Sequence, residues 1–184
     1  MPTDFYYDGA NGSDTTGNGS QAAPYKTIKN ATVGGVFNPS VVRFFIKRGT
    51  TVEIVGGAIH PQGPFYIGPY GDGEEWATLL CNNGGSYYLA TGTGCAAGDI
   101  IHFDSIKIVD ADLSSYVSGV YQNNLDSGTI KVTDCYIKDF FIGIMAQRGT
   151  AQQLLRNTIV GVRNAGIMIE HASVAAPSNM LIAN

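Results

Sequence analysis

The sequence predicts an all-β chain whose strands stack as a parallel solenoid, and three observations support this prediction. Triplets that begin with glycine recur at Gly119, Gly143 and Gly166, with spacings of 24 and 23 residues. A strand of alternating apolar residues precedes each triplet. The chain has 24 glycines and only 14% charged residues, which is unlike the composition of a helical protein. Two short strands in each period of more than twenty residues are typical of one coil of such a solenoid.

The regular repeats occupy the second half of the chain. Their strands, "IHFDSIKIVD", "IKVTDCYIKD" and "QLLRNTIVGV", begin at Ile101, Ile130 and Gln153 and superpose with offsets of 29 and 23 residues. Three apolar columns of this alignment are expected to face the core: Phe103/Val132/Leu155, Ile106/Cys135/Thr158 and Ile108/Ile137/Val160. One polar column is expected at a sharp turn, where side chains bond to their own backbone: Ser105/Asp134/Asn157.

The first half fits this repeat less regularly. Strands interrupted by Gly and Pro are expected at residues 41–49, 51–57, 63–73, 77–84 and 86–92. Coils with insertions between them would have this appearance. The alternative is a sandwich of β-hairpins, which requires turn signals about every 8–12 residues and does not stack like residues on like at a longer period. The solenoid is therefore favoured.

The N-terminal segment predicts a strand, a turn and a cap. Asp8, Asn11 and Asp14 lie in a polar run. The run lacks the residue spacing of a calcium loop and the Gly-Lys-Ser/Thr ending of a phosphate loop. It is therefore expected to form a turn, and weak Ca²⁺ binding stays open. The following "PYKTIKNATV" places Tyr25, Ile28 and Ala31 on one face of a short helix that begins at Pro24. This helix is expected to cover the open end of the first coil.

The chain is expected to form one domain over residues 1–184. Residues 1–35 form the opening strand, turn and capping helix, residues 36–99 the irregular first coils, and residues 100–184 the regular coils. The final "MLIAN" starts the repeat again, with Ile182 in the role of Leu155 and Asn184 in that of Asn157. The coils are therefore expected to continue, or to be capped, beyond residue 184.

Charge and cysteine content exclude several functions. The formal net charge is −4 and only 11 Lys and Arg residues are present, which argues against nucleic acid as a partner. Because no apolar run approaches about 20 residues, we expect no insertion into a membrane. Three cysteines without metal-ligand spacing are expected to be reduced, buried thiols. No export signal precedes the first strand, so the protein is either used without export or shown without its leader.

Residues 5–31 and 65–75 also carry a family resemblance. The run "FYYDGANGSD", followed by "AAPYKTIKNA", "FFIKRGTTVEI" and "IGPYGDGEEWATL", resembles the opening module of the pectate-lyase-like superfamily. The resemblance implies a right-handed, single-stranded parallel β-helix. Members of that superfamily include polysaccharide lyases, glycoside hydrolases and bacteriophage tailspikes, so the shared module implies a carbohydrate-facing protein without naming its chemistry.

Within that superfamily the sequence favours the bacteriophage branch, because it shows no leader and its thiols suit a reducing compartment. The resemblance then implies a homotrimer in the virion tail that associates with other tail proteins and binds, or also degrades, bacterial surface polysaccharide. Two alternatives remain: a secreted polysaccharide lyase or glycoside hydrolase shown without its leader, and a non-catalytic structural segment of a virion.

The candidate carbohydrate site is a row of residues after the repeated glycines, where strand alternation directs side chains outward. The candidate binding residues are Tyr121, Asn123, Gln147, Arg148 and His171. They form a polar stripe beside an aromatic ring, a surface on which a sugar chain can lie. An ordinary solvated sheet face would show the same pattern.

Catalysis by hydrolysis requires two carboxylates, and the candidates are Glu170 and Asp139. Elimination would instead use a carboxylate-held Ca²⁺ and a cationic base. The candidates for that arrangement are Asp110, Asp112 and Asp139 as ligands, with Lys138 or Arg148 as the base. Neither set is specific, since acidic residues at strand ends are commonly just solvated. We therefore expect no obligatory cofactor and leave Ca²⁺ open.

Overall fold

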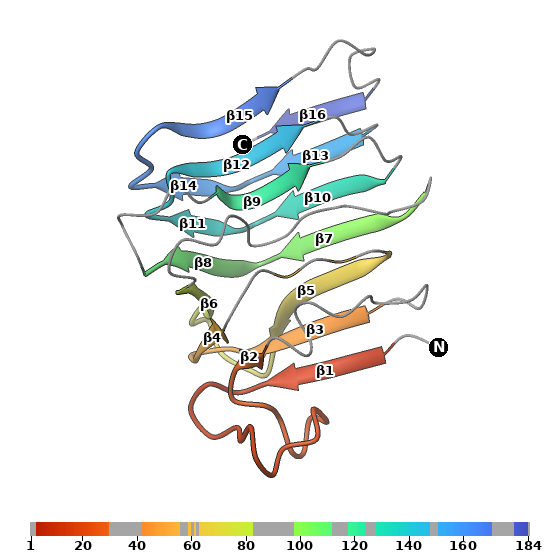
Figure 1. Ribbon diagram of the computed structural model, residues 1–184, viewed down its shortest axis with the longest axis vertical. Coiled ribbons are helices and arrows are strands. Elements are labelled where there is room, and N and C mark those ends of the chain that lie inside the picture. The colour runs from red at the N-terminus through yellow and green to blue at the C-terminus, as the bar shows by residue number, and fades with distance from the viewer. Residues whose placement is uncertain are drawn as a thin grey trace.

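The computed structural model describes residues 3–29, 42–55, 59, 61, 63–82, 98–111, 118–123, 128–147, 151–170 and 179–183. Within these residues the chain is all-β, and its strands form three sheets in which every paired strand is parallel to its neighbours (Figure 1). The described residues contain no helix that could cross a membrane. The strand expected at residues 86–92 lies outside this set.

The largest sheet has seven strands in the order β1-β3-β5-β7-β10-β13-β16. Their bounds are Thr3–Tyr7 (β1), Val42–Lys47 (β3), Phe65–Tyr70 (β5), Ile100–Asp104 (β7), Thr129–Thr133 (β10), Ala151–Leu155 (β13) and Asn179–Ala183 (β16). Each strand pairs with the one that precedes it in this order, so that Figure 1 shows the sheet rising from β1 at one end of the molecule to β16 at the other.

The second sheet has six strands, and the third has three. The six are β2 (Ile28–Lys29), β4 (Thr51–Val55), β6 (Ala77–Cys81), β8 (Ile106–Asp110), β11 (Tyr136–Lys138) and β14 (Thr158–Val160). The three are β9 (Ser118–Asn123), β12 (Ile142–Gln147) and β15 (Ala165–Glu170). From residue 100 onward the chain visits the three sheets in turn and then returns to the first, which produces the repeat seen in the sequence.

The core lies between the sheets, and its register confirms the first repeat offset. Phe103 pairs with Val132 and Ile108 pairs with Ile137, each at a separation of 29 residues, and all four side chains are fully buried. These matched apolar columns stack like residues on like, as the sequence predicts.

The second offset is 22 residues in the first two sheets, not the expected 23. Val132 pairs with Leu154 and Ile137 pairs with Ile159. The core positions predicted for Leu155, Thr158 and Val160 are therefore wrong, and Thr158 is exposed. The glycine spacing of 23 is nevertheless right, because Ile144 pairs with Ile167. The extra residue must therefore lie between β14 and β15, where an alignment anchored on the glycines cannot detect it.

This slip also moves the predicted turn column. Ser105, Asp134 and Arg156 have positive φ angles of 52°, 54° and 53° at the equivalent turn of successive repeats, so Arg156 takes the place expected for Asn157. Asn157 instead joins two repeats. Its Oδ1 accepts a hydrogen bond from the Cys135 N–H at 3.0 Å, and its Nδ2 donates one to the Val132 carbonyl at 2.8 Å. The later partner shifts in the same way, because Ile182 pairs with Leu154 and not with Leu155.

The expected capping helix is wrong for the residues that the structure describes. Ile28 lies in β2, pairs with Ile54 and is fully buried. A ladder partner and complete burial therefore outweigh the weak helical spacing of Tyr25 and Ile28. Ala31 and Asn184 lie outside the described residues.

The polar run after β1 is a turn, as predicted. The carboxylate of Asp8 accepts hydrogen bonds from the N–H groups of Ala10 and Asn11, each at 3.0 Å. The Asp14 carboxylate accepts bonds from Lys26 and Thr27, which ties the two ends of the run together. These carboxylate oxygens accept hydrogen bonds from backbone N–H groups, as is typical of Asp in turns.

The two cysteines in the described part of the chain, Cys81 and Cys135, are free and buried, as expected. Burial raises the pKa of the Cys135 thiol to about 12 and raises that of the Cys81 thiol well above its usual value. Both thiols are therefore protonated at neutral pH and act as small apolar side chains. Cys95 lies outside the described residues.

Candidate functional site

The predicted polar stripe forms a row across the three-stranded sheet, as far as the backbone describes it. Gln147 pairs with Asn123 on one side and with Glu170 on the other. The side chains of these three residues are outside the description, and Arg148 and His171 are outside it altogether. The expectation that this row binds carbohydrate stays a prediction.

Tyr121 does not offer the exposed ring that the stripe requires. Its exposed fraction is 4%, although it alternates with the core residue Val120. Its neighbours in the register are Met145 and, one strand further, Met168, both partly exposed. Tyr121 therefore lies on the outward side of its strand, as predicted, but its ring is buried and not accessible to a ligand in this structure.

The structure does not bring Asp139 and Glu170 together. Asp139 precedes β12, whereas Glu170 is the last residue of β15, and these strands pair from Ile142↔Ala165 to Gln147↔Glu170. Five residue steps of about 3.3 Å separate the two ends by roughly 16 Å. Hydrolysis requires about 5–9.5 Å between carboxyl groups. The backbone separation does not favour such a pair, and the catalytic role of these two residues stays a prediction.

Two of the three carboxylates proposed as Ca²⁺ ligands can be described, and each of these two has a cationic neighbour. Asp110 is buried and lies 3.8 Å from a guanidinium nitrogen of Arg163. Asp139 lies 3.2 Å from the ammonium group of Lys138, the residue suggested as a base. Asp112 is outside the description. Across the residues that can be described, no group of three or more His, Cys, Asp or Glu side chains is placed to hold a metal.

A different surface, which is not among the predicted sites, has the properties of a binding site. It is the outer face of the seven-stranded sheet over β1, β3, β5 and β7. Successive residues of β3 alternate between buried and partly exposed, because one face of the sheet packs on the core. The outward rings are Tyr6, Phe45, Tyr66, Tyr70 and His102, which we call the aromatic face.

The rings of the aromatic face contact one another in a continuous series. Tyr6 stacks on Phe45 with ring centroids 5.1 Å apart, and Phe45 lies 5.7 Å from Tyr66. Tyr66 meets His102 edge to face at 5.5 Å, and Tyr70 meets Tyr6 in the same way at 5.2 Å. Neighbouring parallel strands are about 4.8 Å apart, so the series from β1 to β7 extends over roughly 14 Å.

Gly68 makes the position of Tyr66 possible. A Cβ atom at Gly68 would overlap the phenol oxygen and ring of Tyr66. The tyrosine side chain therefore lies along its own strand, over the backbone of residue 68. Its hydroxyl donates a hydrogen bond to Asp104 Oδ2 at 3.2 Å, on the neighbouring strand β7.

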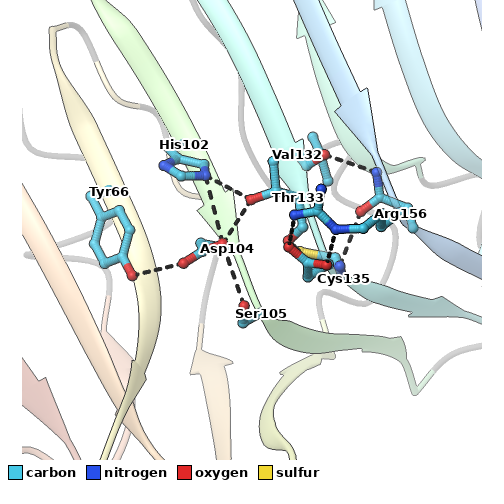
Figure 2. A network of polar contacts seen from close by, with 10 residues as sticks. Tyr66, His102, Asp104, Ser105, Val132, Thr133, Cys135 and Arg156 are labelled. Atoms are coloured by element: carbon cyan, nitrogen blue, oxygen red, sulfur yellow. Dashed lines mark hydrogen bonds and ion pairs between the residues drawn. The ribbon is translucent and has the colours of Figure 1, made fainter. Parts of the chain in front are cut away.

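Asp104 is the centre of a polar network at the end of the aromatic face (Figure 2). Its Oδ1 accepts a hydrogen bond from the Thr133 hydroxyl at 2.7 Å, and from Ser105 at 3.4 Å. His102 Nε2 lies 2.8 Å from the same Thr133 oxygen and 3.8 Å from Asp104 Oδ1. Three neighbouring strands, β5, β7 and β10, thus contribute to one hydrogen-bonded cluster.

Ion pairs flank the rings on the N-terminal side. Arg43 binds the Asp4 carboxylate through two hydrogen bonds of 2.7 Å, and its guanidinium lies 5.6 Å from the centre of the Phe45 ring. The ammonium group of Lys47 lies 2.7 Å from Asp8. The aromatic face therefore combines ring surfaces with charged groups that are already paired, which lowers the cost of covering them with a ligand.

Burial shifts the protonation equilibria of this surface. It raises the pKa of Tyr66 to about 12, and the charge of Asp104 and the hydrogen bond to it act in the same direction. Burial, with the nearby charge of Asp8, also raises the pKa of Tyr70 to about 12. For His102, burial lowers the pKa; the Lys131 charge lowers it further, and the Asp104 charge opposes both. Near neutral pH all three rings are therefore uncharged.

The signal for the aromatic face is present in the sequence. Adjacent aromatic residues occur in "DFYYD", "RFFIK" and "PFYIGPY", and in each pair one ring must point inward and the other outward. The repeat alignment is clear only over residues 100–184, so it does not place these outward rings beside each other. Comparisons of the chain with protein-family models, with curated proteins and with solved structures found no match.

Proposed function

We propose that the three parallel sheets are the faces of a right-handed, single-stranded parallel β-helix similar in fold to the pectate-lyase-like superfamily. The order in which the chain visits the sheets and the like-on-like register of its core columns support this. The right-handed sense follows from general experience, because connections between parallel strands are right-handed in about 98% of cases.

We further propose that this chain binds bacterial surface polysaccharide through the aromatic face, as part of a bacteriophage tailspike or tail-associated protein. The observation that supports binding is the continuous series of partly exposed rings on neighbouring strands. The C–H groups on the face of a pyranose ring are weakly positive and pack on the negative face of an aromatic ring. The hydroxyl groups at the sugar edge require polar partners, which Asp4, Arg43 and Asp104 provide.

The aromatic face favours binding without cleavage. Its carboxylates Asp4 and Asp104 lie on β1 and β7, three strand spacings or roughly 14 Å apart. This exceeds the separation of about 5–9.5 Å that glycoside hydrolysis requires. We therefore assign the site to adhesion and not to hydrolysis. We also propose that the protein is a homotrimer located in the virion tail, and both properties can be measured.

Binding is tested with capsular polysaccharide and lipopolysaccharide preparations by isothermal titration calorimetry. We expect Tyr66→Ala and Tyr6→Ala each to weaken binding at least tenfold, because each removes a ring from the series. Tyr136→Ala is the matched control, since Tyr136 is a partly exposed aromatic residue on the six-stranded sheet. Equal losses for Tyr66→Ala and Tyr136→Ala would contradict the assignment of the site.

The same preparations test for cleavage and for assembly. New reducing ends would indicate hydrolysis, and unsaturated products that absorb in the ultraviolet would indicate elimination; either result favours an enzyme. Light scattering of the protein in solution gives its oligomeric state. A stable trimer supports the tailspike proposal, whereas a monomer favours a secreted protein.

A further inference from the structure

The network around Asp104 determines which nitrogen of His102 carries the proton. A threonine hydroxyl has one proton, and that of Thr133 is donated to Asp104 Oδ1 at 2.7 Å. Toward His102 Nε2, at 2.8 Å, the same oxygen can only accept a hydrogen bond. The Nε2 atom of His102 must therefore be the protonated nitrogen.

The opposite arrangement would leave a repulsive contact. If Thr133 donated its proton to an unprotonated Nε2, its oxygen would face Asp104 Oδ1 at 2.7 Å with no hydrogen between them. An ionised carboxylate accepts hydrogen bonds and donates none, so the contact would bring two lone pairs together. The Thr133 side chain is also well buried, with 4% of the residue exposed, so water is poorly placed to relieve that contact.

It follows that Nδ1 of His102 is the hydrogen-bond acceptor of the ring. A neutral imidazole has one donor nitrogen and one acceptor nitrogen. In the described part of the chain Nδ1 has no hydrogen-bond partner. This atom is also not fully buried, since the fully buried polar atoms without a partner do not include it. Figure 2 shows this nitrogen directed away from Thr133 and Asp104. The ring thus presents an accessible lone pair beside Tyr66.

We propose that His102 Nδ1 is the specificity-determining hydrogen-bond acceptor of the glycan site, and that Thr133 and Asp104 are positioning residues that hold its tautomer. This inference rests on the proposed function of the aromatic face. It selects a sugar whose hydroxyl donates to Nδ1 while its ring packs on Tyr66. A sugar that presents an ether or a carboxylate at that position is disfavoured, because two acceptors would then face each other.

The proposal predicts a dependence of binding on pH. The charged and titratable groups that face His102 are Asp104 on its own strand, Lys131 on β10 and Tyr66 on β5. Burial and Lys131 lower the pKa of His102 from 6.5, and Asp104 opposes them. Below that lowered pKa both ring nitrogens carry protons and the acceptor is lost. Glycan affinity should therefore be constant near pH 7 and fall as the pH decreases through the pKa of His102.

The tautomer is tested first, without any glycan, by ¹⁵N NMR of the imidazole nitrogens in the full chain. The His102 signals are assigned by their absence in His102→Phe. We expect a protonated Nε2 and an unprotonated Nδ1 in the wild type, and a mixture of tautomers in Thr133→Val. The control is Thr129→Val on the same strand, which should leave the signals unchanged. A protonated Nδ1 in the wild type, or no change in a folded Thr133→Val, would overturn the inference.

Binding is tested second, by calorimetry with the polysaccharide that the wild type binds best. We expect His102→Phe to weaken binding at least tenfold, because it keeps an aromatic ring beside Tyr66 and removes the acceptor. If Tyr66→Ala weakens binding while His102→Phe does not, the glycan site stands and the role of His102 is wrong. If the wild type binds no polysaccharide, the proposed function and the role of His102 in it both fail, and only the tautomer assignment can stand.

Discussion

At the scale of single residues, one buried carboxylate holds the start of the chain together. The Asp8 side chain is 3% exposed. It accepts hydrogen bonds from two backbone N–H groups and from Lys47. Burial by itself raises the pKa of Asp8, but these hydrogen bonds outweigh it and the pKa is lowered. A lowered pKa contributes stability above the unfolded-state value near 3.8, and this contribution is lost as the pH falls through the folded-state value.

We expect Asp8→Asn to reduce the free energy of unfolding at pH 7 by about 1–3 kcal/mol, because it removes charge-assisted bonds at a buried site. The control is Asp4→Asn, which breaks a pair with side chains 29% and 38% exposed. Such exposed pairs contribute about 0–1 kcal/mol. Urea denaturation measures both. Asp8→Asn should also reduce the loss of stability below pH 4, and equal effects of the two substitutions would argue against this role of Asp8.

At the scale of strands, the repeated glycines exist because neighbouring repeats approach closely. A Cβ atom at Gly143 would lie 2.5 Å from Ile159 Cγ2 and 2.6 Å from the carbonyl oxygen of Gly166. A Cβ atom at Gly119 would lie 2.7 Å from the Gly143 carbonyl oxygen and 2.8 Å from Ile137 Cγ2. Gly166 is different, since a Cβ atom there meets nothing within 4 Å. The glycine is thus needed where the next repeat stacks upon it.

Gly143→Ala should therefore lower the free energy of unfolding by about 1–3 kcal/mol, through overpacking against β14 and β15. Gly166→Ala is the matched control, with the same chemical change at the equivalent position of the next repeat. It should change stability by less than about 1 kcal/mol. Thermal and urea unfolding of both variants provide the comparison. A larger loss at Gly166 than at Gly143 would contradict the packing at this corner.

At the scale of the whole molecule, the N-terminal half of the seven-stranded sheet is aromatic on both faces. Inside, Phe5, Phe44, Phe65 and Phe103 form a series with ring centroids 5.1–6.3 Å apart. Outside lies the aromatic face. Each strand of this sheet pairs only with its neighbours in the strand order, so rings on both faces reinforce the same strand interfaces.

This arrangement predicts sensitivity to alkali. The pKa of both Tyr66 and Tyr70 is about 12, against 10 in the unfolded chain. A raised pKa contributes stability that is complete below pH 10 and is lost as the pH rises toward 12. We expect the urea midpoint of the wild type to fall over this interval, and the double substitution Tyr66→Phe, Tyr70→Phe to reduce that fall. An unchanged fall in the double variant would show that other groups cause it.

Much of the parallel stacking was predictable because stacked repeats leave a recognisable period in the sequence. The glycine triplets and the 29-residue offset correctly predicted parallel stacking from residue 100 onward. The 22-residue register was not predictable, since one inserted residue between β14 and β15 makes the glycine spacing 23, which differs from the register of the two preceding strands. The prediction of a capping helix was wrong because three apolar positions over seven residues do not distinguish a short helix from a buried strand.

The candidate site required the tertiary structure. The strand alternation that directs one ring of each aromatic pair outward follows from the amino-acid order, because the two faces of a strand alternate with every residue. The contacts among Tyr6, Phe45, Tyr66 and His102 depend on the folded chain, because these rings are brought together by the register of paired strands that lie up to 39 residues apart in the chain. The folded chain also decided the tautomer of His102. That assignment depends on a 2.7 Å and a 2.8 Å contact that meet at one Thr133 hydroxyl, which has a single proton to donate.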